Sequence, residues 1–489
     1  MRRAIRLSII LMGFTAMASQ IIITRELFIV FYGNELSISF ILAGWLIAGA
    51  IGSAGLGRFA DRIKYKMTVF SLCQTALGLI LPSCIVAARL IKPLLNINAG
   101  QAVPLFPVIS LSFLVLAPVC IMLGFMFSLG CGIYESPSGS SAIKIGNVYI
   151  LEAAGSLIGG ALTSVVLIKL FDAVNIAAFF TVLNISAAFL LMVSSKETRM
   201  NRPLAASALV LFLAVIMMWP AGGFRRIEEY SLKKQWHGYG LVASRNSIYG
   251  NIAVVKKGEN FSFFENGFHL YTIPDKLNSE EAAHMALLEH PDPEDVLLIG
   301  GGSGGLAEEI LKEPVKKLDY VELDPLIINM AETYLPDSYY RALKDERVSI
   351  KNVDGRFFVK TAKEKYDCVI VHVGDPYTAQ INRYYTVEFF KEVKNILKPG
   401  GILSLAMTSS ESYISRPLGE FLSSVYFSLK EVFGDVLIMP GDTAYFIASG
   451  RGGYLTYDYK VLEKRTGERS LDTQYMREYY LFSKLLLHF

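Results

Sequence analysis

The apolar positions of this chain follow two patterns, which meet near residue 222. Before that point, long apolar stretches recur, each long enough to cross ~30 Å of hydrocarbon as a helix. After it, short apolar runs alternate with charged segments. The pattern therefore predicts a membrane domain of about seven helices at residues 1–222, followed by an aqueous part. The expected spans are 7–31, 36–57, 67–91, 104–133, 145–168, 174–194 and 204–220.

The aqueous part begins with a linker and a β-rich region, assigned to residues 223–278. Within it, residues 240–275 alternate between apolar and polar positions and contain the turn sequences KKGEN and ENGF. This pattern predicts a small antiparallel β-unit. The next segment, SEEAAHMALLEH, predicts a helix with Ser279 as its N-cap.

Strands and helices alternate over residues 279–489, which predicts a Rossmann-like α/β domain with a parallel sheet. The strand DVLLIG runs into a turn, Gly300 to Gly305, where missing side chains let the backbone approach a ligand. Glu322 follows about 20 residues later, where a carboxylate can bind both hydroxyls of a ribose. Asp354 and Gly355, after the next strand, are placed to meet a base. The LKPGG turn and the final hairpin favour an S-adenosylmethionine-type fold over a dinucleotide fold.

The composition gives no indication of nucleic-acid binding, disulfide bonds or a metal site. The 489 residues carry a net charge of only +3, so nothing points to nucleic acid. The five cysteines and six histidines are scattered, so neither a disulfide framework nor a metal site is expected.

Charges near the expected spans leave the topology open. The positive residues favour an N-terminus on the inside, and seven spans would then place the C-terminal part outside. A cofactor made in the cytosol argues the opposite. We therefore expect a multi-pass cell-membrane protein with a cytoplasmic soluble domain, which requires one span to be miscounted. Three ionisable residues inside the spans indicate either pairing within the bundle or a polar substrate path: Arg25, Glu26 and Glu152.

Several segments together resemble the spermidine/spermine synthase (polyamine aminopropyltransferase) family over roughly residues 240–450. They are VLLIGGGSGGLAEEILK, YVELDP, DGRFFV, YDCVIVHVGDP and YYTVEFFKEVKNILKPGGI. The first half, with GFTAMASQIIITRELFIVFYGNELS and GRFADR, is similar to the membrane domain of the multi-pass branch. The resemblance implies a class I methyltransferase-like domain. It also implies transfer of an aminopropyl group from decarboxylated S-adenosylmethionine to an amine such as putrescine, without a metal. The expected partners are this amine or a membrane-embedded acceptor and the lipid bilayer, with a homodimer left open.

Family positions supply the candidate site residues. By position, Glu322 would hold the ribose, and Asp354 with Gly355 the adenine. His284 falls near a histidine of the family that contacts the polyamine. The remaining cofactor-binding candidates are Gly300, Gly302, Ser303 and Gly304, and the remaining substrate-binding candidates are Tyr249, Gln380, Tyr384 and Tyr385.

The chain departs from the family pattern at three places. The usual D-x-x-D-P turn reads His372 to Pro376 here, so His372 replaces the usual proton acceptor and Asp375 remains. Neutral imidazole can also accept a proton near pH 7, so both residues are catalytic candidates. Ser303 replaces an aspartate that matches the free ammonium of the donor. Gly250 stands where soluble members carry a glutamine.

Three functions remain open. The leading hypothesis is a membrane-bound, spermidine-synthase-like transferase of aminopropyl-type groups. Ser303 motivates an alternative, a methyl- or aminocarboxypropyl-transferase that uses intact S-adenosylmethionine on a membrane-embedded acceptor. The ionisable residues within the spans motivate a non-catalytic, nucleoside-gated transporter or sensor.

Overall fold

The computed structural model describes residues 1–98, 100–134, 140–195, 198–450 and 455–486. The chain forms two compact units. The first contains residues 1–253 and 264–268, and the second contains residues 254–263 and 269–489.

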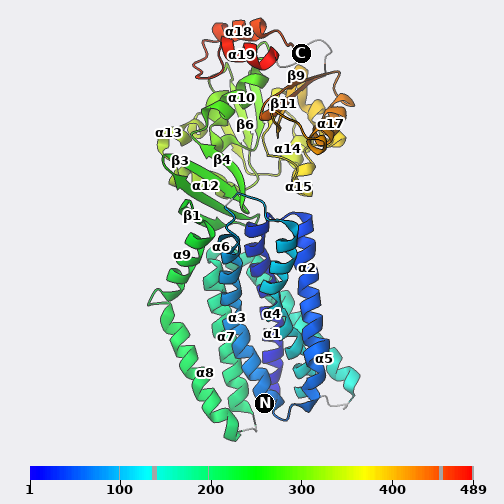
Figure 1. Ribbon diagram of the computed structural model, residues 1–489, viewed down its shortest axis with the longest axis vertical. Coiled ribbons are helices and arrows are strands. Elements are labelled where there is room, and N and C mark those ends of the chain that lie inside the picture. Colours follow the sequence, from blue (N-terminus) through cyan, green and yellow to red (C-terminus); the bar gives the residue numbers. More distant parts are fainter. Residues whose placement is uncertain (99, 135–139, 196–197, 451–454, 487–489) are drawn as a thin grey trace. The chain divides into compact units, whose positions relative to one another are not determined.

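Long helices make up most of the first unit (Figure 1). Among the described residues, seven helices are long and apolar enough to cross a membrane, and each expected span falls on one of them. They are α1 (Arg2–Phe31), α2 (Glu35–Ala50) with the helical turns that follow to Arg62, α3 (Lys66–Leu94), α4 (Leu105–Ile133), α5 (Ser141–Leu162) with α6 (Ile168–Leu170), α7 (Ala173–Ser194) and α8 (Thr198–Met218).

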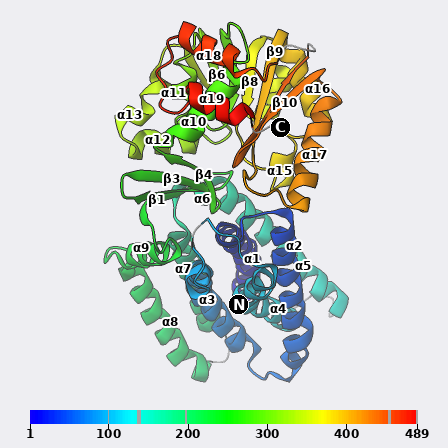
Figure 2. The same cartoon turned by 45° about the horizontal axis from the view of Figure 1, so that its top comes forward.

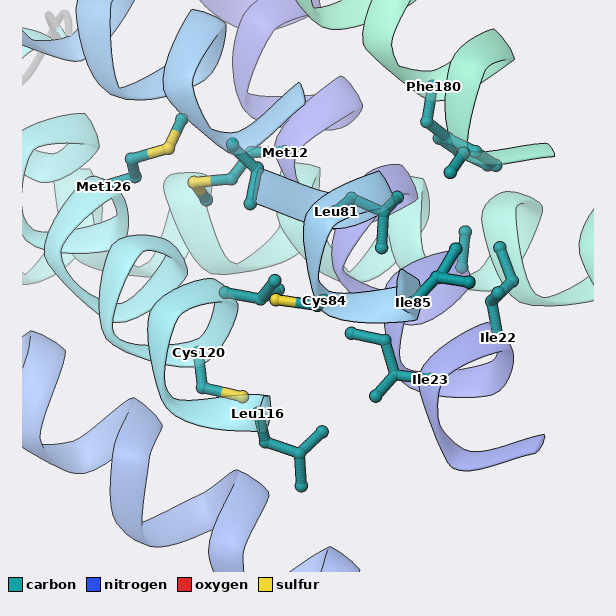
Figure 3. Close-up of a cluster of buried hydrophobic side chains, with 14 of the residues drawn as sticks. Met12, Ile22, Ile23, Leu81, Cys84, Ile85, Leu116, Cys120, Met126 and Phe180 are labelled. Atoms are coloured by element: carbon teal, nitrogen blue, oxygen red, sulfur yellow. The ribbon is translucent and has the colours of Figure 1, made fainter. Parts of the chain in front are cut away.

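The core of this unit lies around α1, which contacts α3, α4, α5 and α7. Apolar side chains from these helices meet in one buried cluster, part of which is drawn in Figure 3. The labelled members are Met12, Ile22 and Ile23 of α1, Leu81, Cys84 and Ile85 of α3, Leu116, Cys120 and Met126 of α4, and Phe180 of α7.

Two glycines of α5 allow its backbone to touch the backbone of α1. A Cβ atom on Gly155 would lie 1.9 Å from the carbonyl oxygen of Ile10, and one on Gly159 would lie 2.3 Å from that of Phe14. No side chain fits into such a gap, so the small residues set the distance between the two helices.

Gly155→Ala is expected to lower the free energy of unfolding of the first unit by ~1–3 kcal/mol, because the added methyl group forces the helices apart. Gly146→Ala is the matched control on α5, since no described atom lies within 4 Å of its Cβ position. Thermal unfolding of the purified variants measures the difference. Equal midpoints for the two variants would contradict the backbone contact.

Two of the three ionisable residues expected within the apolar helices, Arg25 and Glu26, have hydrogen-bond partners. Arg89 donates to both carboxylate oxygens of Glu26 at 2.8 Å and also binds Glu228 of α9 (Gly223–Gln235). Arg25 donates to the carbonyl oxygen of Ser247 at 2.8 Å. These contacts give Arg25 and Glu26 partners within their own unit. Glu152 is half-buried on α5.

The expected small β-unit is present as a four-stranded sheet of order β1-β2-β3-β4. Its strands are β1 (Gly240–Asn246), β2 (Asn251–Lys257), β3 (Asn260–Glu265) and β4 (Phe268–Ile273). The next helix, α10 (Lys276–Leu287), begins earlier than predicted. Its N-cap is Asp275, whose side chain accepts from the N–H of Asn278, so the assignment of Ser279 as the cap was wrong.

The second unit is built on a seven-stranded sheet of order β10-β11-β9-β8-β5-β6-β7. Part of this sheet, with β6, β8, β9 and β10 labelled, is visible in Figure 2. Neighbouring strands from β9 to β7 pair in parallel, whereas β11 pairs antiparallel with β9 and β10. The predicted parallel sheet and final hairpin are confirmed. The strands are β5 (Asp295–Ile299), β6 (Lys317–Val321), β7 (Val348–Lys351), β8 (Tyr366–Val371), β9 (Leu397–Thr408), β10 (Asp435–Met439) and β11 (Thr443–Ser449).

Helices cover both faces of this sheet. Apolar residues of α14 (Gly355–Thr361), α16 (Val387–Ile396) and α17 (Arg416–Lys430) pack on one face, and α10 contacts β8, β9 and β11. The strand order reverses at β5, which has β6 on one side and β8 on the other. Such a reversal opens a crevice at the carboxyl ends of the strands. The remaining helices are α11 (Leu306–Ile310), α12 (Pro325–Tyr334), α13 (Asp337–Tyr340), α15 (Ala379–Asn382), α18 (Tyr459–Glu468) and α19 (Glu478–Leu486).

Candidate functional site

The candidate site lies at the carboxyl edge of the seven-stranded sheet. The glycine turn follows β5, Glu322 follows β6, Asp354 lies beyond β7, and His372 and Asp375 follow β8. Parallel strands end at the same edge, so the fold gathers residues that the sequence spreads over about 75 positions.

The glycine turn is packed between a histidine and a tyrosine. Gly301 has φ +72°, and a Cβ atom there would lie 2.6 Å from the ring of His372. A Cβ atom on Gly302 would lie 2.6 Å from the ring of Tyr320. The backbone N–H of His372 donates to the carbonyl oxygen of Ile299 at 2.8 Å. The start of the His372–Pro376 segment is therefore packed directly against the glycine turn.

Gly302→Ala is expected to lower the free energy of unfolding of the second unit by ~1–3 kcal/mol, because its methyl group displaces the fully buried Tyr320. Gly467→Ala in α18 is the control, because no described atom lies within 4 Å of its Cβ position. Chemical denaturation of both variants measures the difference. A Gly302→Ala protein as stable as the control would contradict the tight packing of the turn.

Glu322 shares Tyr320 with the glycine turn. The Tyr320 hydroxyl donates to Glu322 Oε2 at 2.9 Å, and the N–H of Asp324 donates to Oε1 at 3.4 Å. Burial raises the pKa of Glu322 to about 7, with these hydrogen bonds opposing the rise. The carboxylate is thus held in one orientation and changes its charge near neutral pH.

Ser303 lies within the glycine turn and carries no charge. Its Oγ atom is hydrogen-bonded to the Tyr271 hydroxyl at 2.8 Å, and the residue is 3% exposed. Burial raises the pKa of Tyr271, so its hydroxyl stays protonated. The turn therefore meets two tyrosines, Tyr271 and Tyr320, neither of which we singled out from sequence. The sequence signal that could have indicated Tyr271 is the alternation of apolar and polar residues along β4.

Asp354 and Gly355 begin α14. One oxygen of Asp354 accepts the N–H of Phe357 at 2.9 Å, and the other forms an ion pair with Arg383. A Cβ atom on Gly355 would lie 2.9 Å from the hydroxyl oxygen of Tyr384. The structure therefore brings Tyr384 next to Asp354–Gly355.

Asp375 is fixed by its neighbours. Its Oδ1 atom accepts the N–H of Thr408 at 3.0 Å, and its Oδ2 atom accepts the Tyr377 hydroxyl at 3.1 Å. The Tyr385 hydroxyl donates to the carbonyl oxygen of Gly374 at 2.6 Å. These bonds orient the carboxylate at the end of β8, and they give Tyr385 the role of holding the turn.

The surroundings of His372 favour the neutral form of its imidazole. Burial lowers the pKa of its imidazole, and the charge of Asp275 opposes that shift only in part. Within the described part of the chain, its Nδ1 atom is buried and has no hydrogen-bond partner. A neutral imidazole with a free nitrogen can accept a proton.

His284 does not join this group. It is fully buried, with Nδ1 2.7 Å from Glu313 and Nε2 3.4 Å from Glu309. Burial lowers its pKa, but the two carboxylates outweigh burial and the net shift is upward. The expectation that His284 contacts a polyamine does not fit this arrangement, because both ring nitrogens are engaged by the protein.

Two other expected substrate contacts are exposed to solvent. Tyr249 belongs to the first unit and is 44% exposed, and Gln380 is exposed on α15. A cavity of about 20 Å³ adjoins Gly304 and Gly305, and one of about 280 Å³ lies at the other edge of the sheet, beside Lys317 and Ser349. Among the described residues, no group of three or more His, Cys, Asp and Glu could hold a metal ion.

Comparison with known proteins agrees with the motifs. Residues 276–424 match the spermine/spermidine synthase domain. A polyamine aminopropyltransferase of Oceanobacillus iheyensis is 30% identical over 268 residues, which cover 54% of this chain and 52% of the relative. One of Korarchaeum cryptofilum is 34% identical over 172 residues, which cover 35% and 51%. The chain thus spans about half the length of these curated relatives.

Two of the solved structures that are similar to this chain are spermidine synthases. A spermidine synthase in complex with the transition state analogue AdoDATO is 25% identical, with a TM-score of 0.44, and the match covers 50% of this chain and 85% of that one. A spermidine synthase from Thermotoga maritima is 23% identical, with a TM-score of 0.42, and the match covers 50% of this chain and 84% of that one.

Proposed function

Because this chain belongs to the spermine/spermidine synthase family through its C-terminal part, we propose that it transfers an aminopropyl-type group from decarboxylated S-adenosylmethionine to an amine acceptor. The observation that carries the proposal is the arrangement at the carboxyl edge. Asp375 is oriented there by Thr408, and His372 lies against the glycine turn.

The donor is proposed to lie along the glycine turn. Glu322 would accept hydrogen bonds from the two ribose hydroxyls, which requires its ionised form. The adenine is assigned to Asp354 and Gly355 beside Tyr384. The aminopropyl chain and the sulfonium would then point from Ser303 toward the turn that contains Asp375.

The chemistry is a substitution at the carbon next to the sulfonium. The lone pair of the acceptor nitrogen forms the new C–N bond, the C–S bond breaks, and methylthioadenosine leaves with its electron pair. The acceptor amine must first lose a proton, because an ammonium has no lone pair. Asp375 is proposed to attract the ammonium and accept this proton, with His372 as a second acceptor.

The test is product formation. Purified protein incubated with decarboxylated S-adenosylmethionine and a set of diamines is expected to release one methylthioadenosine for each aminopropylated amine. Chromatography with mass detection measures both products. No methylthioadenosine with any diamine would remove the proposal.

Ser303 supports a second candidate, a methyl- or aminocarboxypropyl-transferase that uses intact S-adenosylmethionine. Its buried hydroxyl is neutral and bonded to Tyr271, so no carboxylate at this position repels the donor's own carboxylate. Calorimetric titration with both donors discriminates between the candidates. Tighter binding of the decarboxylated donor would count against the second one.

The seven apolar helices support a location in the cell membrane. We place the enzyme there as a multi-pass protein with its second unit in the cytoplasm, where the donor is made; with seven spans, the N-terminus then lies on the opposite side of the membrane. Protease added to sealed vesicles of known orientation tests the side. Cleavage of the second unit only in right-side-out vesicles would contradict the cytoplasmic placement.

A further inference from the structure

The chain beyond α18 is fastened to α10 by buried polar contacts. The Glu280 side chain is 1% exposed and accepts three backbone N–H groups. The donors are Gln474 at 2.8 Å, Tyr475 at 2.8 Å and Met476 at 3.1 Å. This anchor leads directly into α19, the last described helix.

The next residue of α10, Glu281, forms an ion pair with a lysine of α19. Nζ of Lys484 lies 2.7 Å from Glu281 Oε1, and the Tyr480 hydroxyl also donates to this carboxylate. Glu281 is 3% exposed and Lys484 is 5% exposed. Burial and the nearby charge of Glu281 raise the pKa of Tyr445, which is buried on β11. A primary ammonium is thus enclosed by protein and faces one buried carboxylate.

This ammonium lies at the same edge of the sheet as the candidate site. It is 3.6 Å from Glu411 on the loop after β9, and it lies against Gly441 in the β10–β11 turn. Thr408, at the end of β9, donates its N–H to Asp375, and its partner in the sheet is Thr443, just after Gly441. Adjacent strands therefore connect the lysine position to the catalytic turn.

The chemistry of the occupant matches that of the proposed acceptor. A lysine side chain is a primary ammonium on a four-carbon stem, as is one end of an alkyl diamine. Burying a cation costs several kcal/mol unless a carboxylate pairs with it, so Glu281 and its neighbours are arranged to receive an ammonium.

We propose that Glu281, Glu411 and Tyr445 form an ammonium-binding subsite for the acceptor, and that Lys484 occupies it as an internal competitor. The inference rests on the proposed function, because it takes an alkyl diamine as the acceptor. A diamine displaces α19, one ammonium binds Glu281, and the other end reaches toward Asp375. Held in place, α19 keeps the enzyme closed to low concentrations of amine.

Hydrogen exchange of the wild-type protein tests the displacement without any variant. Saturating 1,4-diaminobutane with methylthioadenosine is expected to speed exchange in residues 478–486, whereas α17 remains unchanged. Sodium chloride at the same ionic strength is the control for screening. Unchanged exchange in 478–486 at saturating amine would overturn the proposal.

Calorimetric titration of variants with 1,4-diaminobutane tests the competition. Lys484→Met is expected to bind the diamine about tenfold tighter or more, because the diamine no longer competes with the tethered ammonium of Lys484 for Glu281. Lys484→Arg keeps the cation and is expected to stay near wild type, and Glu281→Gln is expected to lose binding. The matched control is Lys464→Met, whose ammonium pairs with Glu468 on the exposed side of α18. Equal affinity of Lys484→Met and wild type would overturn the proposal.

The two proposals fail separately. Methylthioadenosine release together with unchanged exchange in 478–486 would remove the subsite and leave the transferase activity in place. Faster exchange on adding the diamine, without product from any donor, would keep the subsite and remove the aminopropyl transfer.

Discussion

Asp375→Asn is expected to lower kcat/KM for aminopropyl transfer by ~10²- to 10⁴-fold, the usual contribution of a positioned base. The amide keeps the oxygen that accepts the Thr408 N–H, so the turn should keep its shape. It cannot accept the proton of the acceptor ammonium, and it no longer attracts that cation. The affinity for the donor should therefore remain unchanged. Steady-state kinetics and donor titration measure the two effects.

The control for this variant is Glu420→Gln, which removes an exposed carboxylate of α17 that pairs with Arg416. It should leave the rate unchanged. His372→Gln separates the two candidate bases, because the residue that accepts the proton determines the acidic limb of the rate profile. If Asp375→Asn retained the wild-type rate and His372→Gln lost it, the proton acceptor would be the imidazole.

Glu322→Gln is expected to weaken donor binding by about 10- to 100-fold, because hydrogen bonds to a charged group contribute ~1.5–3 kcal/mol. The amide keeps the size of the side chain and can still accept one ribose hydroxyl. Calorimetry with the donor measures the loss. Glu308→Gln is the control, since its carboxylate pairs with Lys276 at the partly exposed start of α11.

The pH dependence provides a second test of Glu322. Its folded pKa is about 7, above the ~4.3 of an unfolded glutamate. Its contribution to folding stability is therefore complete below pH ~4.3 and is lost as the pH rises through about 7. Donor affinity should change in the opposite sense, rising through pH 7 as the carboxylate ionises. Glu322→Gln should abolish both dependences, and a flat donor affinity in the wild type would contradict the ribose role.

Patterns that repeat locally allowed most of the fold to be predicted. The seven long apolar helices among the described residues follow from uninterrupted apolar runs, and the parallel sheet follows from strands that alternate with helices. The glycine turn and Glu322 could be located because a strand must end before each of them. These features depend on neighbours only a few residues away, so the sequence is sufficient to find them.

The start of α10 was mispredicted for a reason that is also local. Ser279 and Asp275 are both good N-caps, and the apolar pattern could not choose between them. In the folded chain, the Ser279 hydroxyl donates to the carbonyl oxygen of Gly304 at 3.3 Å. Packing of the helix against the glycine turn, rather than the capping propensity, decided its role.

By itself, the sequence determined which segments are helices and strands and which chemistry they can present, because periodicity and turn residues act over short distances. Only the tertiary structure decided which ionisable groups are buried and what they face. His284 meets Glu313, 29 residues away, and Glu281 meets Tyr480, 199 residues away. Charge and pKa depend on desolvation and on partners across such distances, so the position of Lys484 at the carboxyl edge of the sheet could not be predicted from the pattern.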